Sequence, residues 1–246
     1  MCLIAVAWHA SAARPLIVAA NRDEAHARPT VPAAWWSDAP DVLAGRDLTA
    51  GGTWLGIDRR GRFAAVTNLV TPGWQGPAAR SRGALVADFL RGREPAARYA
   101  ARIGAEADAY GPFNLLVADD DALWFVGTRS PAHALGPGVH AVSNVEPGVD
   151  WPKVTAARNR LGEVVDSPDV DAELFALLAE RRPAENGYDA RQVSPFVLDP
   201  VWGTRSSTVV VVDRERRVRF VERSFDPRGA PAGEVRFEFD AGPEPI

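Results

Sequence analysis

Residues 2–24 read CLIAVAWHASAARPLIVAANRDE, and this stretch decides how the N-terminal part of the chain folds. It contains two apolar runs, residues 2–8 and 16–20, which have the length of short buried strands. The polar stretch between them contains a proline and predicts a turn. We therefore expect a β-hairpin that brings the start of the chain next to residues 21–24.

The rest of the chain follows a pattern of strands first, helices in the middle and strands again at the end. Residues 22–53 have no clear period and predict mostly loop. Because strands and helices are segregated, we expect packed sheets with helices outside them. No linker divides the chain, so residues 1–246 predict one domain. The further expected strands are 54–58, 62–67, 113–118, 122–127, 138–143, 207–213, 217–224 and 234–239, and the expected helices are 81–91, 94–109, 152–165 and 171–182.

The composition of the 246 residues excludes several classes of protein. With 46% hydrophobic and 24% charged residues, the chain is ordinary for a globular protein. A formal charge of −4 gives no basic field for a dedicated nucleic-acid binder. One cysteine excludes an intramolecular disulfide and a cysteine-based zinc site. No apolar run has the length of a membrane span or a signal-peptide core, which leaves the cytoplasm as the expected location.

Cys2 is the first candidate for chemistry. Small second residues normally permit removal of the initiator Met1, which would leave Cys2 with a thiol and a free α-amine on the same carbon. Such an amine has a pKa of about 7.7–8.0 and can act as the general base for its own thiol. The structural alternative is that Cys2 is a small apolar residue at the start of a strand.

The residues Asn21, Arg22, Asp23 and Glu24 are the second candidate. In the expected hairpin Asp23 would accept a hydrogen bond from the α-amine of Cys2 and orient it, and Arg22 would pair with a thiolate or a substrate carboxylate. Arg22 and Asp23 point inward together only if the strand has ended before them. The alternative is a solvated turn at a strand end.

Two asparagines and one arginine complete the candidate set. Asn68 and Asn144 each end an expected strand, and their amides suit the oxyanion of a tetrahedral intermediate, although turn residues are the structural alternative. Arg205 stands where an apolar strand is expected to begin and invites a carboxylate partner, although it also fits a solvated loop.

The sequence contains no strong motif for binding a metal or a cofactor. The four histidines have no metal-ligand spacing, and no phosphate-binding or dinucleotide-binding glycine motif occurs. We therefore expect no metal site and no required cofactor. Several tryptophans, Trp54 among them, are candidates for lining an apolar pocket, with core packing as the alternative.

The motifs in their order along the chain resemble the TANGO2 family, also called the NRDE family after residues 21–24. The resemblance extends from Met1 to about residue 239. Beside this resemblance, we expect Asn21, Arg22 and Trp54 to bind the substrate. The motifs that carry it are Met1-Cys2, AANRDE (19–24), GGTWLGID (51–58), AVTN (65–68), FNLL (113–116), VSN (142–144), WPK (151–153) and GTRSST (203–208).

This family is in turn similar, more distantly, to N-terminal-nucleophile (Ntn) hydrolases of the choloylglycine hydrolase and penicillin V acylase group. That similarity implies an α+β fold, a four-layer αββα sandwich of two mainly antiparallel sheets flanked by helices. The nucleophile of that group falls on Cys2, and its amine-orienting aspartate falls on Asp23. Its two oxyanion-region asparagines fall on Asn68 and Asn144, and its late arginine falls on Arg205. The chain departs from that group at one position. The group has an arginine near its nucleophilic thiol, but in this chain Ala20 stands at the corresponding position and Arg22 comes two residues later.

Two functions follow as hypotheses. The first is an amidohydrolase in which Cys2 attacks a small amide or thioester. The second, which the TANGO2 resemblance implies, is a non-catalytic protein that binds and traffics haem or acyl-CoA, with haem as cargo rather than cofactor. In that case Cys2 or a histidine would ligate the haem iron, and arginines would pair with propionates or phosphates.

Overall fold

A computed structural model describes residues 2–74, 76, 78–149 and 151–242. The chain divides into two units, the first from residues 1–27 and 137–240, the second from residues 28–136 and 241–246. The prediction of one domain stays a prediction. No helix among the described residues is long and apolar enough to cross a membrane.

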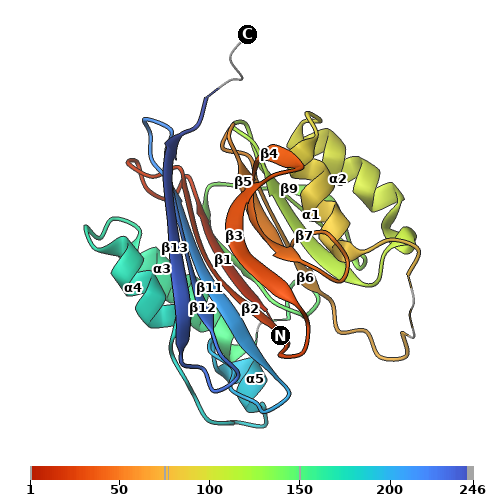
Figure 1. Ribbon diagram of the computed structural model, residues 1–246, viewed down its shortest axis with the longest axis vertical. Coiled ribbons are helices and arrows are strands. Elements are labelled where there is room, and N and C mark those ends of the chain that lie inside the picture. The colour runs from red at the N-terminus through yellow and green to blue at the C-terminus, as the bar shows by residue number, and fades with distance from the viewer. Residues whose placement is uncertain (1, 75, 77, 150, 243–246) are drawn as a thin grey trace. The chain divides into compact units, whose positions relative to one another are not determined.

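The first unit contains a six-stranded antiparallel sheet built from both ends of the chain (Figure 1). The strand order is β10-β1-β2-β11-β12-β13. Strand β2 therefore pairs with β1, its neighbour in sequence, and with β11, which lies near the C-terminus. The strands are β1 (Leu3–Trp8), β2 (Leu16–Ala25), β10 (Gly138–Val142), β11 (Trp202–Val212), β12 (Arg217–Phe225) and β13 (Pro231–Asp240).

Helices cover one face of this sheet. They are α3 (Pro152–Val164), α4 (Val170–Leu178) and the short α5 (Ala190–Val193). Helix α3 packs on β1 and β10, and α4 packs on β2 and β11. The apolar residues between them form a continuous core that includes Leu3, Ile17, Ala19, Leu161 and Leu174. Burial of this apolar surface fixes which face of β2 points toward the helices.

The second unit contains a seven-stranded antiparallel sheet whose strands follow one another in chain order, from β3 to β9. Helix α1 (Arg82–Arg91) packs on β4, β5 and β6, and helix α2 (Ala96–Ala105) packs on β8 and β9. Ser81 caps α1 by accepting a hydrogen bond from the Gly83 amide. A short 3₁₀ helix spans Ala107–Ala109. The strands are β3 (Thr30–Trp36), β4 (Ala39–Asp47), β5 (Leu55–Asp58), β6 (Phe63–Asn68), β7 (Phe113–Ala118), β8 (Leu123–Gly127) and β9 (Ser130–Leu135).

The predicted α+β class with two antiparallel sheets is confirmed, whereas the predicted loop over residues 22–53 is wrong. Strand β2 continues to Ala25, and β3 and β4 fill most of the following stretch. Strand β3 contains Pro32, lies at the edge of its sheet and pairs with β4 in a register that shifts twice. Both features break the alternation of polar and apolar residues by which a strand is detected.

Candidate active site

The β1–β2 hairpin brings Cys2 next to the NRDE residues, as predicted. Leu3 pairs with Asn21, so Cys2, one residue before β1, lies beside the stretch that follows Asn21. The alternative of a solvated turn at these residues is wrong, because they lie inside β2. Arg22 and Asp23 therefore point to opposite faces of the sheet. Asp23 shares the helix-facing side with Ile17, and Arg22 lies on the other side.

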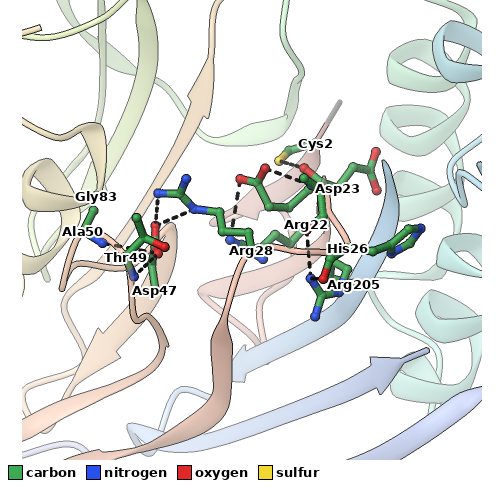
Figure 2. Close-up of polar contacts among 12 residues, drawn as sticks. Cys2, Arg22, Asp23, His26, Arg28, Asp47, Thr49, Ala50, Gly83 and Arg205 are labelled. Atoms are coloured by element: carbon green, nitrogen blue, oxygen red, sulfur yellow. Dashed lines mark hydrogen bonds and ion pairs between the residues drawn. The ribbon is translucent and has the colours of Figure 1, made fainter. Parts of the chain in front are cut away.

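The thiol of Cys2 contacts the main chain of Asp23. Its Sγ lies 3.7 Å from the Asp23 carbonyl oxygen (Figure 2). The carbonyl of Cys2 accepts a hydrogen bond of 2.6 Å from the Ser143 hydroxyl, directly after β10. The residue is half-buried. Burial raises the pKa of the thiol above its usual value, and the negative charge of Asp23 acts in the same direction, while the positive charges of the chain's amino terminus and of Arg22 oppose them.

The carboxylate of Asp23 is held between a hydroxyl and an ammonium. Its Oδ1 accepts a hydrogen bond of 2.6 Å from the Thr204 hydroxyl. Its Oδ2 lies 3.9 Å from Nζ of Lys153, and neither side chain has any exposed area. Burial lowers the pKa of Lys153, and the charge of Asp23 opposes that shift. Thr204 belongs to β11 and Lys153 to α3, so three distant segments meet at this carboxylate.

Sequence reasoning missed Lys153. Two signals pointed to it: it is the only lysine in the chain, and it closes the motif WPK at residues 151–153. The structure shows that this residue is fully buried and paired with the aspartate of the candidate site.

Asn21 is engaged inside the first unit. Its amide group donates hydrogen bonds of 2.8 Å to the carbonyl of Leu178 and of 2.9 Å to that of Pro195. Its Oδ1 accepts a hydrogen bond of 2.6 Å from the Ser207 hydroxyl. Asn21 thereby ties the end of α4 and the segment after α5 to the sheet. Its role in substrate binding stays a prediction.

Arg205 lies inside β11, at an irregularity in the pairing with β2, rather than at the beginning of a strand. Its guanidinium donates hydrogen bonds of 3.0 Å to the carbonyl of Ala25 and of 3.2 Å to that of His26 (Figure 2). Burial lowers its pKa, and the positive charge of Arg22 adds to the effect. The side chain of Arg22 forms an ion pair of 3.7 Å with Glu24.

The two asparagines predicted for the oxyanion lie in different units. Asn144 is buried in the first unit and directly follows Ser143, the residue that bonds to Cys2. Asn68 is the last residue of β6 in the second unit, where Trp54 packs against the core beneath α1. The structure therefore brings Cys2, Asp23, Asn144 and Arg205 into one unit, and the roles of Asn68 and Trp54 beside Cys2 stay predictions.

The part of the chain that the structure describes contains no group of three or more histidine, cysteine, aspartate or glutamate residues arranged to hold a metal ion.

Solved structures with the same fold are hydrolases. An N-acylethanolamine-hydrolyzing acid amidase ortholog from Caenorhabditis elegans is similar over 85% of this chain and 92% of its own, with a TM-score of 0.54 and 14% identity. The C2A mutant of a conjugated bile acid hydrolase from Clostridium perfringens is similar over 98% of this chain and 92% of its own, with a TM-score of 0.50 and 9% identity. The chain thus has the predicted Ntn-hydrolase fold.

Sequence comparison identifies the family within that class. The family model for Transport and Golgi organisation 2 (TANGO2) matches residues 1–227, so the chain belongs to the TANGO2 family. A homolog from Bos taurus is 35% identical over 239 residues, which cover 85% of this chain and 86% of that protein. A homolog from Homo sapiens is 32% identical over 257 residues, which cover 91% and 92%. The predicted family resemblance is confirmed.

Proposed function

We propose that the chain is an amidohydrolase in which Cys2 attacks the carbonyl carbon of a small amide or thioester. The observation that carries this proposal is the position of the Cys2 thiol, 3.7 Å from the Asp23 carbonyl in the β1–β2 hairpin, in a fold shared with amide hydrolases. The fold by itself does not define an activity, because activity depends on the residues of the site.

The reaction begins once Met1 has been removed and Cys2 carries a free α-amine. The amine takes the thiol proton as the sulfur forms a bond to the carbonyl carbon. The amide group of Asn144, which lies in the same unit as Cys2, donates a hydrogen bond to the resulting oxyanion. The protonated amine then gives its proton to the leaving nitrogen or sulfur, and that bond breaks. Water, deprotonated by the same amine, hydrolyses the thioester between Cys2 and the acyl group and releases a carboxylic acid.

The electrostatics of the site support an internal base rather than a preformed thiolate. Burial raises the thiol pKa of Cys2, so the thiol is protonated at neutral pH and needs a base to activate it. An α-amine with a pKa of about 7.7–8.0 suits that task. Asp23 orients the amine, Arg205 tunes the thiol or a substrate carboxylate, and Arg22 binds the substrate.

The first test is the intact mass of the purified protein before and after treatment with a haloacetamide. Because Cys2 is the only cysteine, a single added group reports on this thiol alone. The proposal expects loss of Met1 and single alkylation whose rate rises between pH 6 and pH 8. Retention of Met1 would contradict it.

The second test is hydrolysis of a panel of N-acylethanolamines, conjugated bile acids and simple acyl thioesters. We expect Cys2→Ala and Asp23→Asn to reduce turnover at least a hundredfold, a loss typical for a nucleophile or its positioning group. Asn159→Ala, an exposed change on α3, is the matched control. Full activity of Cys2→Ala would overturn the proposal. In that case a Soret titration with haem and calorimetry with acyl-CoA would test the alternative, a binding and trafficking function.

A further inference from the structure

Lys153 occupies a position that is unfavourable for a positive charge. It is the second residue of α3, where the positive end of the helix dipole repels cations. Its side chain is fully buried, which removes the hydration of the ammonium group. The other basic residues of the chain are all arginine, so this position departs from the rest of the sequence. Because burial and the helix dipole both disfavour a charged ammonium here, Lys153 needs a specific negatively charged partner.

The charged groups that surround Lys153 come from three other segments. Asp23 of β2 is the nearest, at 3.9 Å, and its charge acts on Lys153 most strongly. The thiolate form of Cys2 and the carboxylate of Asp189, just before α5, also favour the ammonium form. The ring of Trp151 lies 5.9 Å from Nζ. Lys153 therefore lies against the Asp23 carboxylate, which the proposed reaction uses, and is close enough to the Cys2 thiol for the two charges to interact.

We propose that Lys153 is a positioning residue that fixes the Asp23 carboxylate from one side and shares it with the α-amine of Cys2, so that this amine can act as the base. The proposal extends the proposed function, since the amine becomes free only after Met1 is removed. Thr204 fixes one carboxylate oxygen by its hydrogen bond of 2.6 Å, and Lys153 lies against the other.

One carboxylate then serves two cations, the α-ammonium of Cys2 and the ammonium of Lys153. The positive charge of Lys153 weakens the attraction of Asp23 for the α-ammonium, whose ordinary pKa is about 7.7–8.0. Without the lysine charge, the full charge of Asp23 acts on the α-ammonium and raises its pKa. The Cys2 thiol also loses a nearby positive charge; burial and the charge of Asp23 raise the pKa of that thiol, and the charge of Arg22 lowers it.

The test is the rate of Cys2 alkylation as a function of pH. Lys153→Met should move the midpoint upward by about one pH unit, which slows alkylation at pH 7 about tenfold. Lys153→Arg, which keeps the charge, should stay within about 0.3 units of the wild type. The double variant Lys153→Met with Asp23→Asn should return toward the wild-type midpoint, because both charges are absent. Arg219→Met is the matched control, since it breaks an ion pair between β12 and α4 in the same unit.

An unchanged midpoint in Lys153→Met, together with a lower melting temperature, would overturn the proposal and leave Lys153 a structural role only. If Lys153→Met does not fold, Asp23→Asn is compared with the double variant, and the proposal expects the lower midpoint in the variant that retains Lys153. Intact mass separates this test from that of the proposed function. Retained Met1 would overturn both proposals, because Cys2 would then have no free α-amine, whereas loss of Met1 with an unchanged midpoint in Lys153→Met would overturn this proposal alone.

Discussion

Replacing Asn21 with alanine should destabilise the first unit rather than act on substrate binding alone. The change removes two hydrogen bonds to the carbonyls of Leu178 and Pro195 and one from the hydroxyl of Ser207, all of them buried. At about 1 kcal/mol for each bond, the free energy of unfolding should fall by about 3 kcal/mol. For a chain of 246 residues this corresponds to a melting temperature lower by about 6–12 °C.

The assay is thermal unfolding by calorimetry, with urea unfolding as an independent measure. Ser207→Ala removes only one of the three bonds and should cost about 1 kcal/mol. Asn159→Ala on the exposed side of α3 is the matched asparagine control and should change stability by less than about 0.5 kcal/mol. A melting temperature for Asn21→Ala within 2 °C of the wild type would refute the reasoning, because the three buried bonds would then contribute nothing.

Three further predictions concern single side chains. In the form that retains Met1, burial raises the pKa of the Cys2 thiol, so the pH midpoint for its alkylation should lie above the ordinary cysteine value of about 8.5. The same protein unfolded in guanidinium should alkylate with a midpoint near that ordinary value. Tyr99→Phe removes the 2.6 Å hydrogen bond to the Leu85 carbonyl and should lower the free energy of unfolding by about 1–2 kcal/mol in urea titrations. Burial raises the pKa of Tyr99 in the folded protein, so above pH 10 the tyrosine ionises first in the unfolded protein, which lowers the free energy of unfolding. The Tyr99→Phe variant has no such group and should lose less stability in that pH range. The carboxylate of Asp58 is fully buried and forms an ion pair of 2.7 Å with Arg60. Asp58→Asn breaks this pair and should lower the melting temperature by several degrees. Arg59→Gln, at the exposed neighbouring position, is the control and should leave the melting temperature unchanged.

The sequence patterns predicted most elements of the fold because most of them have a regular period or a clear turn signal. The hairpin around residues 59–61, helix α1 with its Ser81 cap, and the strands β7 and β8 are local features. The predicted end of the second strand at residue 20 was too early for a physical reason. Asn21 and Asp23 are polar residues in a buried strand, and their partners lie more than 150 residues away in the sequence.

The candidate site was predicted in part. The pairing of Cys2 with the NRDE residues follows from a short hairpin, so local patterns were sufficient. The position of Lys153 depends on how α3 packs on the sheet, and no period or spacing encodes that contact. Residues 203–206 were not predicted as part of a strand for a related reason. Their side chains are polar, so no apolar pattern marks the strand, and the pairing of β11 with β2 that includes them is long-range.

The pairing of β2 with β11 has a consequence for the order in which the protein folds. The hydrogen bond between Thr204 and Asp23 joins residues 181 positions apart, so the first unit has a high contact order. The second unit is a meander of sequential strands and can form while later residues are still on the ribosome. Until β11 is synthesised, β2 remains an unpaired edge of apolar residues that invites association with other chains. The surroundings of Cys2 are thus completed only once β11 has been synthesised, and until then the open edge of β2 makes the nascent chain prone to aggregation before the protein acquires its proposed activity.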